Sequence, residues 1–442
     1  MFYIVEKESK LVSLENFIRV GCFVHVISSN DLYHPKLSKT VAVYIRMINS
    51  KHGFIIPIEH EDGLNVDKKR VYDILNKAQV IYTLNKKDLL YHFNIQKAID
   101  ISLAYSMKYF DKLEYKSSIP TIDWYYNKFS ENKNINTFIP IAKLYEKCEL
   151  VYDSIKDFIT NIEIPDGFDF YNKLATNVFF LIEQSGLGIY YEPFNNTFKP
   201  RNPLFNTKDN KVFTSYNLYN PTSRPTNNFN SVNFAAIPHT EAHRKTFKPQ
   251  NDYFVEFDFD GYHLRLLCEQ IDYPLTKESA HKQLAKSYFN TTDITEEQYK
   301  EAKQINFQAI YGKIPEEHKN LEIFKQIQQY IDAMWSSFNE GSYVWNPQSG
   351  KHFTNELKDM HPAKLMNYMM QSLETSNNII ILKEVLEYLK DKKTLIALYT
   401  YDAFLFDFSK EDKSEVLENI QKIMEKHGKY PVKFKYSTNL ML

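Results

Sequence analysis

The chain has 442 residues, with 54 Lys or Arg against 55 Asp or Glu, so its formal net charge is −1. A nearly neutral chain has no global basic field, so any contact with a polyanion must be local. The cysteines Cys22, Cys148 and Cys268 match neither a disulfide framework nor a zinc cluster, and they indicate a reduced, cytosolic protein. Charged or polar residues interrupt each apolar run, so we expect neither a signal peptide nor a membrane span.

Residues 1 to about 115 alternate short β-like runs with helix-like stretches, which predicts an α/β layer. The β-like runs are MFYIVE, HGFIIPI and AQVIYTL, and the helix-like stretches are VYDILNKA and KAIDISLAYSMKYF. Residues 120–185 have the 3.6-residue period of a mainly helical block. The next stretch, with NNTFKPRNPLFNTKDNK and NPTSRPTNNFNSVNF, is rich in Asn, Thr and Pro and predicts a loop or linker.

The pattern becomes regular again from residue 252. YFVEFDF predicts a strand, YHLRLLCEQ predicts a helix, and a helical block continues to about residue 340. Thr295 is the expected N-cap of one helix in this block. A long helix is expected near 362–390, followed by the apolar strand pair TLIALYT and AFLFDF.

Carboxylates lie at the ends of two of these strands. Glu256, Asp258 and Asp260 alternate with phenylalanines, so period 2 places them on one face, where like charges repel unless a cation lies between them. A solvated outer face explains this stretch alone equally well. Asp402 interrupts the apolar hairpin, where a turn-forming Asp is the plain alternative. Two acidic strand ends far apart in sequence predict that they meet around metal.

Lys303, Phe307 and Tyr311 follow one another at intervals of four residues, so they form one stripe of a helix. An ammonium on an otherwise aromatic stripe suits a ligand with a polyphosphate at one end and a flat ring at the other. A nucleoside triphosphate has this form. For the stripe alone, an amphipathic core helix with a snorkelling lysine is the more frequent explanation.

The order of these stretches resembles motifs A, B and C of family A DNA polymerases. The residues that match the three motifs are Asp258 and Arg265 in FDFDGYHLRLL, Lys303, Phe307, Tyr311 and Gly312 in KQINFQAIYG, and Asp402 in YTYDAFLFDF. Further matches are His281 in SAHKQLAKSYF, Asn367 and Gln371 in NYMMQ, and Arg224 and Asn233 in SRPTNNFNSVNFAAIPH. The resemblance covers about residues 205–442, in the family's order throughout.

Several positions depart from the family's pattern. Tyr299 stands where the family usually has an Arg, and His263 stands where it has a Glu beside the nucleotide sugar. Tyr401 and Ala403 flank Asp402, where the family has a His and a polar or acidic residue.

The resemblance implies a multidomain chain of α/β and α+β parts: a right-hand polymerase with palm, fingers and thumb behind a degenerate 3′–5′ exonuclease-like α/β domain. In the exonuclease-like domain, Val5 and Lys7 would replace the family's acidic pair. The implied domains are 1–115 (exonuclease-like), 116–190 (helical, thumb-like), 191–270 (first part of the palm), 271–358 (fingers) and 359–442 (second part of the palm).

The implied activity is template-directed DNA synthesis by two-metal-ion nucleotidyl transfer without proofreading. Asp258, Asp402 and the backbone carbonyl of Phe259 would hold two Mg²⁺ ions, with Mn²⁺ as an alternative, and Lys303 would assist catalysis. The resemblance assigns nucleotide contacts to His281, Phe307, Tyr311, His263 and Arg265. It assigns contacts with primed DNA to Arg224, Asn233, Asn367 and Gln371.

The implied partners are primed DNA template, dNTPs, and replisome or processivity factors, and we expect a monomer in the cytoplasm of a phage-infected bacterial host. His263 is bulky, so deoxynucleotides should still be preferred. Two other functions stay open. A single-subunit RNA polymerase or primase-like enzyme shares these motifs, and a catalytically inactive DNA-binding scaffold would need no metal pair.

Overall fold

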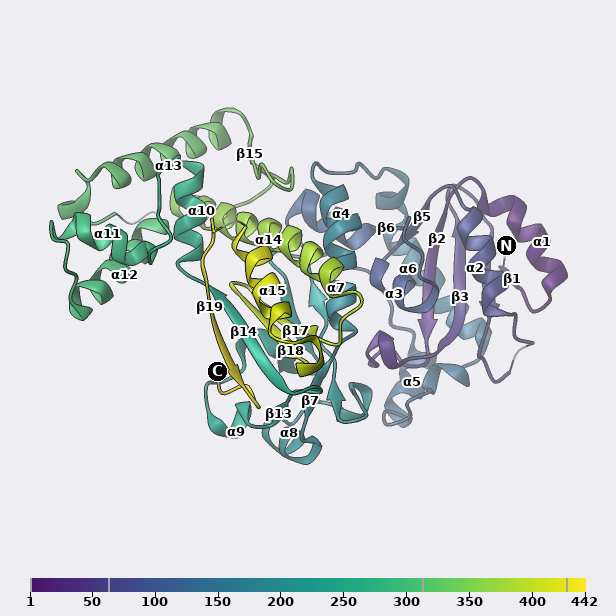
Figure 1. Cartoon of the computed structure of the whole chain (residues 1–442). Coiled ribbons are helices and arrows are strands. Elements are labelled where there is room, and N and C mark those ends of the chain that lie inside the picture. The colour runs from purple at the N-terminus through teal and green to yellow at the C-terminus, as the bar shows by residue number, and fades with distance from the viewer. Residues whose placement is uncertain (1, 63, 312–313, 427) are drawn as a thin grey trace. The chain divides into compact units, whose positions relative to one another are not determined.

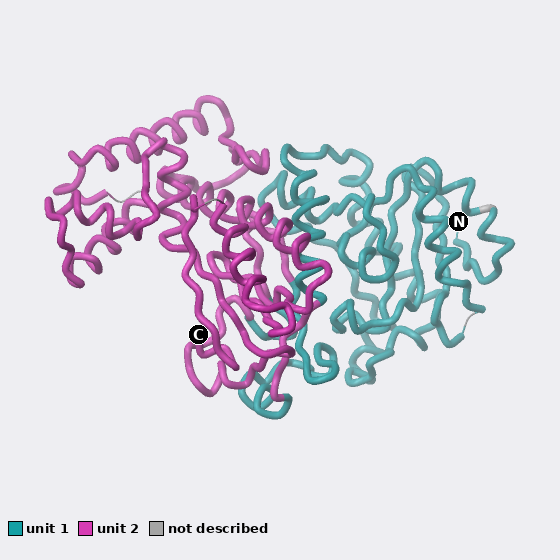
Figure 2. Tube along the Cα trace, viewed as in Figure 1, with its two compact units in different colours: residues 1–184, 191–215, 228–233 teal, residues 185–190, 216–227, 234–442 magenta. Residues whose placement is uncertain are grey.

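The computed structural model describes residues 2–62, 64–311, 314–426 and 428–442. These residues form two compact units (Figure 1, Figure 2). Unit 1 comprises residues 1–184, 191–215 and 228–233, and unit 2 comprises residues 185–190, 216–227 and 234–442. Gly312, which completes the match to motif B, lies outside the described residues. Helices and several sheets occur together, so the predicted mixed α/β character is confirmed.

Unit 1 contains a six-stranded sheet in the order β1-β4-β3-β2-β5-β6. β3 runs antiparallel to β2 and β4, whereas β5 is parallel to both β2 and β6. β2 and β3 are buried along nearly their whole length, as expected for strands covered on both faces. The strands are β1 (Phe2–Ile4), β2 (Cys22–Ser28), β3 (Thr40–Met47), β4 (Gly53–Pro57), β5 (Ile81–Thr83) and β6 (Ile99–Asp100).

Helices cover both faces of this sheet. Adjacent residues of a strand point to opposite faces, and Val24 and Phe23 accordingly enter two different apolar clusters. The first cluster includes Leu14 of α1 (Glu8–Ile18), and the second includes Leu144 of α6 (Ile141–Thr160). The helices that complete unit 1 up to residue 184 are α2 (Lys68–Lys77), α3 (Lys86–Phe93), α4 (Ile101–Tyr109), α5 (Pro120–Lys128), the π-helix η3 (Phe170–Ala175) and α7 (Thr176–Glu183). The predicted helical block is confirmed.

The first strand and the residues after it include Val5 and Lys7, where the resemblance implies a lost acidic pair. β1 lies at the edge of the sheet, parallel to β4, whereas β2 and β3 form its centre. Val5 is 2% exposed within the apolar core, and Lys7 is the residue that precedes α1. The correspondence of Val5 and Lys7 to a lost pair of metal ligands stays a prediction.

The stretch predicted as loop or linker contains short ordered elements. Side-chain amides satisfy its backbone, as where Asn206 Nδ2 donates to the Phe213 carbonyl at 2.7 Å. Composition alone could not distinguish such a segment from a linker, because the same residues are frequent in both. The elements are α8 (Tyr191–Phe198), β8 (Thr207–Lys208), β9 (Lys211–Val212), β10 (Tyr216–Asn217), β11 (Thr226–Phe229) and β12 (Val232–Asn233).

Unit 2 contains a four-stranded sheet in the order β17-β18-β14-β19. Its strands are antiparallel to their neighbours: β14 (Tyr253–Phe259), β17 (Leu395–Thr400), β18 (Ala403–Phe408) and β19 (Val432–Ser437). β17 and β18 form the predicted hairpin, with Tyr401 and Asp402 at its turn. Asp258 pairs with Ala403, which follows Asp402, so the register brings the two predicted acidic strand ends together at the same end of the sheet.

A 28-residue helix, α14 (Pro362–Leu389), confirms the long helix expected near 362–390. It contacts α10 (Tyr262–Gln270), α15 (Glu415–Glu425) and β17, and its middle is buried. Figure 1 shows α14 and α15 beside the sheet of unit 2. The polar side chains in the middle of α14 therefore lie inside the fold rather than in solvent.

Three further helices precede α14: α11 (Ala280–Tyr288), α12 (Glu296–Ile310) and α13 (Glu322–Glu340). Thr295 caps α12 as predicted, because its side chain accepts from the Gln298 N–H and Gln298 reciprocates. The remaining short elements are β7 (Leu187–Ile189), α9 (Glu241–Arg244), β13 (Phe247–Lys248), β15 (Tyr343–Trp345) and β16 (His352–Thr354). Across the described residues, every helix is too short or too polar to cross a membrane.

Candidate active site

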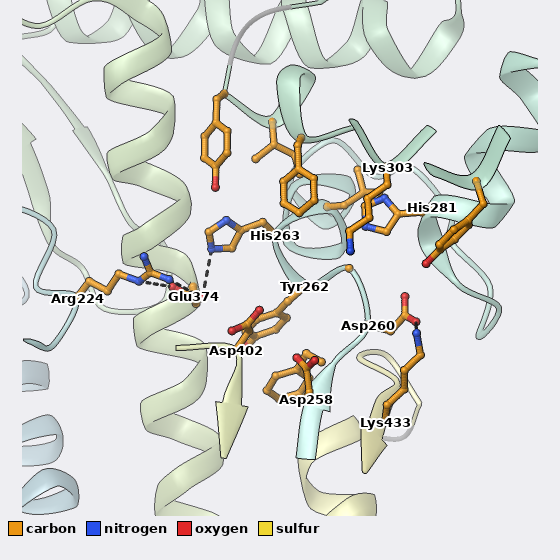
Figure 3. Close-up of a pocket in the computed structure, with 17 residues that line it drawn as sticks. Arg224, Asp258, Asp260, Tyr262, His263, His281, Lys303, Glu374, Asp402 and Lys433 are labelled. Atoms are coloured by element: carbon orange, nitrogen blue, oxygen red, sulfur yellow. Dashed lines mark hydrogen bonds and ion pairs between the residues drawn. The ribbon is translucent and has the colours of Figure 1, made fainter. Parts of the chain in front are cut away.

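A cavity of about 280 Å³ in unit 2 brings together most of the predicted site residues. The end of β14, the hairpin turn, and helices α10, α11, α12 and α14 all contribute to its wall (Figure 3). The predicted residues that line it are Arg224, Asp258, Phe259, His263, His281, Lys303, Phe307, Tyr311 and Asp402. Segments that are far apart in sequence thus form one site.

Asp258 and Asp402 form the acidic floor of this cavity. The Phe259 N–H donates to the Asp402 carbonyl at 3.1 Å, which fixes the strand end against the hairpin turn. Burial, then repulsion by Asp402 and Glu256, raises the pKa of Asp258 to about 6. Displacement of water by neighbouring atoms, then repulsion by Glu374, raises the pKa of Asp402. Two carboxylates that repel each other in this way are a donor set suited to a bound cation.

The acidic floor of the cavity consists of a pair of carboxylates, Asp258 and Asp402. Among the described residues, no group of three or more His, Cys, Asp or Glu side chains is arranged to hold a metal ion. Asp260 points instead to β19, where its Oδ2 lies 2.5 Å from Lys433 Nζ. Of the three carboxylates predicted for one strand face, Asp260 therefore separates from Asp258. Asp260 is paired with Lys433, whereas Asp258 faces the negative charge of Asp402.

The stripe on α12 faces the cavity. Lys303, Phe307 and Tyr311 all line it, with Lys303 Nζ 5.8 Å from the centre of the Phe307 ring. Phe307 is 45% exposed and Tyr311 is 39% exposed, although both are large and apolar. An amphipathic core helix would bury these rings, so the structure contradicts that alternative for this stripe.

His281, on α11, is 5% exposed and lies behind Lys303 in the view of Figure 3. Burial lowers the pKa of His281 to about 4, so its imidazole is neutral at pH 7. The Asn306 side-chain amide lies 3.0 Å from its Nδ1. Because that amide nitrogen can only donate, Nδ1 accepts and Nε2 carries the proton. His281 thus offers a neutral N–H donor beside the Lys303 ammonium.

Four predicted residues lie outside the lining of this cavity. Arg265 is buried and donates to the backbone carbonyls of Asp260, Thr276 and Glu278, at 2.9, 3.0 and 2.6 Å. Its guanidinium thus holds the chain between α10 and α11.

The other three are predicted DNA contacts. Gln371 donates to Asn367 at 3.0 Å on α14, and the Thr222 hydroxyl donates to Gln371 at 3.2 Å. Asn233 ends β12 in unit 1. The roles of these residues stay predictions.

Sequence reasoning missed Glu374, a cavity residue on α14 that is 1% exposed. Its Oε2 lies 2.8 Å from Arg224 Nε, and its Oε1 lies 3.3 Å from His263 Nε2 (Figure 3). The His263 Nε2 thus faces a carboxylate that the sequence did not predict for it. A signal was present, since Asn367, Gln371 and Glu374 follow at helical spacing on one face of α14.

β19 also contributes to the cavity, which the sequence did not predict. Lys433 lines the cavity, and its hydrogen bond to Asp260 raises its pKa, so it stays cationic at pH 7. Tyr299 lines the cavity as well, at the position where the resembling family has an Arg. The cations of this cavity are therefore Arg224, Lys303 and Lys433 among the described residues that line it.

Unit 1 has a cavity of its own, of about 250 Å³. Its lining includes His25 and Asp31 from β2 and the turn after it, Asp88 and His92 on α3, and Lys147 on α6. Asp31 Oδ2 lies 2.6 Å from Lys147 Nζ, so its charge already has a partner. Burial raises the pKa of Asp88 to about 7.

The fold of the chain is similar to that of a DNA polymerase domain. A similar solved structure is the POL domain of Pol1 from M. smegmatis in complex with DNA primer-template and dNTP, with a TM-score of 0.68. The two chains are 12% identical, and the match covers 100% of this chain and 99% of that one. No protein-family model matches the chain, and no curated protein matches it.

Proposed function

We propose that the chain is a template-directed DNA polymerase of the family A type, which adds dNTPs to a primer 3′-end. The observation that carries the proposal is the single cavity in which Asp258 and Asp402 face Lys303 and His281. A carboxylate pair opposite a cation and an N–H donor suits a reaction at a phosphate. The likeness in fold to a DNA polymerase domain supports the same conclusion.

The cavity fits the metal ions that this chemistry needs. Asp258, Asp402 and the backbone carbonyl of Phe259 would hold them, because oxygen ligands are what Mg²⁺ prefers. Divalent ions bound there supply activation of the primer 3′-oxygen and neutralisation of the pyrophosphate that leaves. The raised pKa values of Asp258 and Asp402 support this fit, since a cation between them would relieve their repulsion.

The chain's own side chains bind and orient the nucleotide. Lys303 and the Nε2–H of His281 contact the phosphates and stabilise the charge that develops on them. Phe307 and Tyr311 offer exposed aromatic faces to the sugar and base. Asp260 holds Lys433 at the cavity edge, where its ammonium adds positive charge in place of the Arg that Tyr299 replaces.

Primed DNA is the proposed second substrate. Arg224, Asn367, Gln371 and Asn233 would contact the minor groove, where correctly paired bases present their acceptors in nearly the same place. Arg224 has Nε and one terminal nitrogen directed to Glu374, so the rest of its guanidinium remains for DNA. Palm, fingers and thumb, a monomeric state and a phage origin belong to this proposal.

Primer extension with the four dNTPs and Mg²⁺ on a primed DNA template tests the proposal. We expect products that reach the end of the template. A single-subunit RNA polymerase or primase-like enzyme would instead extend with ribonucleotides, and a DNA-binding scaffold would bind the template without turnover. Absence of extension with both Mg²⁺ and Mn²⁺ would contradict the proposed function.

We expect no 3′→5′ degradation of a mismatched primer. Hydrolysis by two metals needs carboxylates free to bind them, whereas Asp31 in the unit 1 cavity is paired with Lys147. The measurement is the length of a 5′-labelled, 3′-mismatched primer after incubation with Mg²⁺. Metal-dependent shortening that Asp31→Asn or Asp88→Asn removes would overturn this expectation.

Chain terminators should be poor substrates, and Phe307→Tyr should improve their use by roughly tenfold or more. Phe307 has no hydroxyl, so it cannot replace the 3′-OH that a dideoxynucleotide lacks, whereas a Tyr at this exposed position can. The measurement is the ratio of kcat/KM for dNTP and ddNTP. Phe289→Tyr is the control, since Phe289 follows α11 outside the cavity lining. An unchanged ratio in Phe307→Tyr would contradict the proposal that Phe307 lies beside the nucleotide sugar.

A further inference from the structure

Glu374 is a carboxylate in the middle of a buried helix, which is an expensive position for a charge. Both of its oxygens have partners from other segments. Its Oε2 lies 2.8 Å from Arg224 Nε, and its Oε1 lies 3.3 Å from both Arg224 Nη2 and His263 Nε2. One carboxylate on α14 thereby ties the segment before β11 to the first turn of α10.

Glu374 also adds negative charge to the proposed active site, because it lines the same cavity as Asp402. Arg224 offsets the charge of Glu374, and its guanidinium also lies 3.6 Å from the centre of the Tyr401 ring. Glu374 adds unfavourable negative charge beside the proposed catalytic carboxylate, and a role in the cavity that both residues line explains its presence there.

The position of His263 and Glu374 within the cavity indicates that role. Figure 3 shows His263 between Glu374 on one side and Lys303 and His281 on the other, above Asp402. A nucleotide with its phosphates at Lys303 and its base toward Tyr311 must place its sugar between them, against His263. The imidazole is 15% exposed, and its Nε2 lies 3.3 Å from Glu374 Oε1, so the carboxylate favours this orientation of the ring.

We propose that Glu374 is a specificity-determining residue that locks the His263 imidazole as the wall against which the nucleotide sugar is selected. This proposal rests on the proposed polymerase function. In this chain α10 supplies the imidazole and α14 supplies the carboxylate. Arg224, whose Nε lies 2.8 Å from Glu374 Oε2, balances the buried charge.

The contact between His263 and Glu374 predicts how the two positions depend on each other. His263→Glu alone brings a second carboxylate next to the buried Glu374, so the two negative charges repel and the wall opens. The double variant His263→Glu with Glu374→His restores one carboxylate and one imidazole in reversed order. We expect the single variant to lose at least tenfold in selectivity for deoxynucleotides and the double variant to recover most of that loss.

The measurement is the ratio of kcat/KM for a matched dNTP and rNTP in single-nucleotide incorporation. Glu374→Gln keeps the size of the side chain but removes the charge that holds His263, and we expect its ratio to fall at least tenfold. Glu387→Gln is the control, because Glu387 lies exposed on the same helix and pairs with Lys383. The thermal unfolding midpoint of each variant separates loss of selectivity from loss of fold.

Each outcome is decisive. A lower ratio in a folded Glu374→Gln, with recovery in the double variant, supports the proposal. An unchanged ratio in Glu374→Gln overturns it while the polymerase function stands, and if Glu374→Gln does not fold, failure of the folded double variant to select deoxynucleotides overturns it. Absence of extension by the wild-type chain overturns the polymerase function, and the proposal with it.

Discussion

Asp258→Asn and Asp402→Asn should each lower the rate of primer extension by roughly 10³-fold or more. Each carboxylate would hold ions worth several kcal/mol of transition-state stabilisation, and 1.4 kcal/mol corresponds to about tenfold in rate. Affinity for primed DNA should stay within about threefold, because most of it comes from contacts to phosphates. The measurements are single-turnover extension and equilibrium binding of a labelled primed template.

The same variants carry a prediction on stability. The pKa of Asp258 is raised from 3.8 to about 6 in the folded chain, so stability falls as the pH rises between these values, and the full cost present at pH 7 disappears when the carboxylate is replaced. Asp258→Asn should therefore unfold at an equal or higher temperature than the wild type at pH 7. Asp391→Asn, in the exposed turn after α14, is the control for both measurements. Near-normal turnover in either active-site variant would refute the assignment of the metal ligands.

Lys303→Ala should reduce kcat/KM for dNTPs by roughly 10²-fold to 10³-fold. Its ammonium is the cation on the α12 face of the cavity, and removal of one preorganised donor from a developing negative charge costs on this order. Lys300→Ala is a matched control, since Lys300 lies on the same helix, pairs with Glu296 and is absent from the cavity lining. The measurement is steady-state incorporation over a range of dNTP concentrations.

Further variants separate the effect of the charge at Lys303 from the effect of its position on α12. Lys303→Arg should retain more activity than Lys303→Ala, because it keeps the charge but presents it in a planar fork. Equal activity of Lys303→Ala and Lys300→Ala would show that α12 does not face the phosphates.

Much of unit 2 could be predicted from sequence because its signals are local. The alternation in YFVEFDF, the cap at Thr295 and the apolar hairpin around Asp402 each depend on a few adjacent residues, and the structure has all three. The meeting of Asp258 with Asp402 followed from chemistry, since two isolated acidic strand ends need a common partner. Strand register then supplied what the sequence could not, namely that Asp258 pairs next to the hairpin turn.

Unit 1 was harder because its central strands carry no alternation. CFVHVIS in β2 and TVAVYIRM in β3 are buried on both faces, so they read as continuous apolar runs without a polar face. The edge strand β1 was predicted, and its correspondence to the strand that carries the acidic pair stays a prediction. The place of a strand in a sheet depends on pairing between distant segments, which a single sequence does not show.

Glu374 was missed for a related reason. A polar residue in a long helix normally faces solvent, and only the packing of α14 against α10 and the hairpin turns this one inward. Asn378, one turn further along α14, accepts from the Tyr262 hydroxyl at 2.6 Å and donates to the Tyr401 carbonyl at 2.7 Å. Tyr401 has a φ of 61°, a strained value for a bulky residue, and these contacts help to hold it.

Template dependence tests the central claim most directly. The purified chain is given a primed DNA in which the first unpaired template base is A, C, G or T, and each of the four dNTPs is supplied alone with Mg²⁺. We predict incorporation of the complementary nucleotide in each case, at least 10²-fold faster than any mismatch, and no product with Asp258→Asn. Incorporation that ignores the template base, or that survives in Asp258→Asn, would contradict the account.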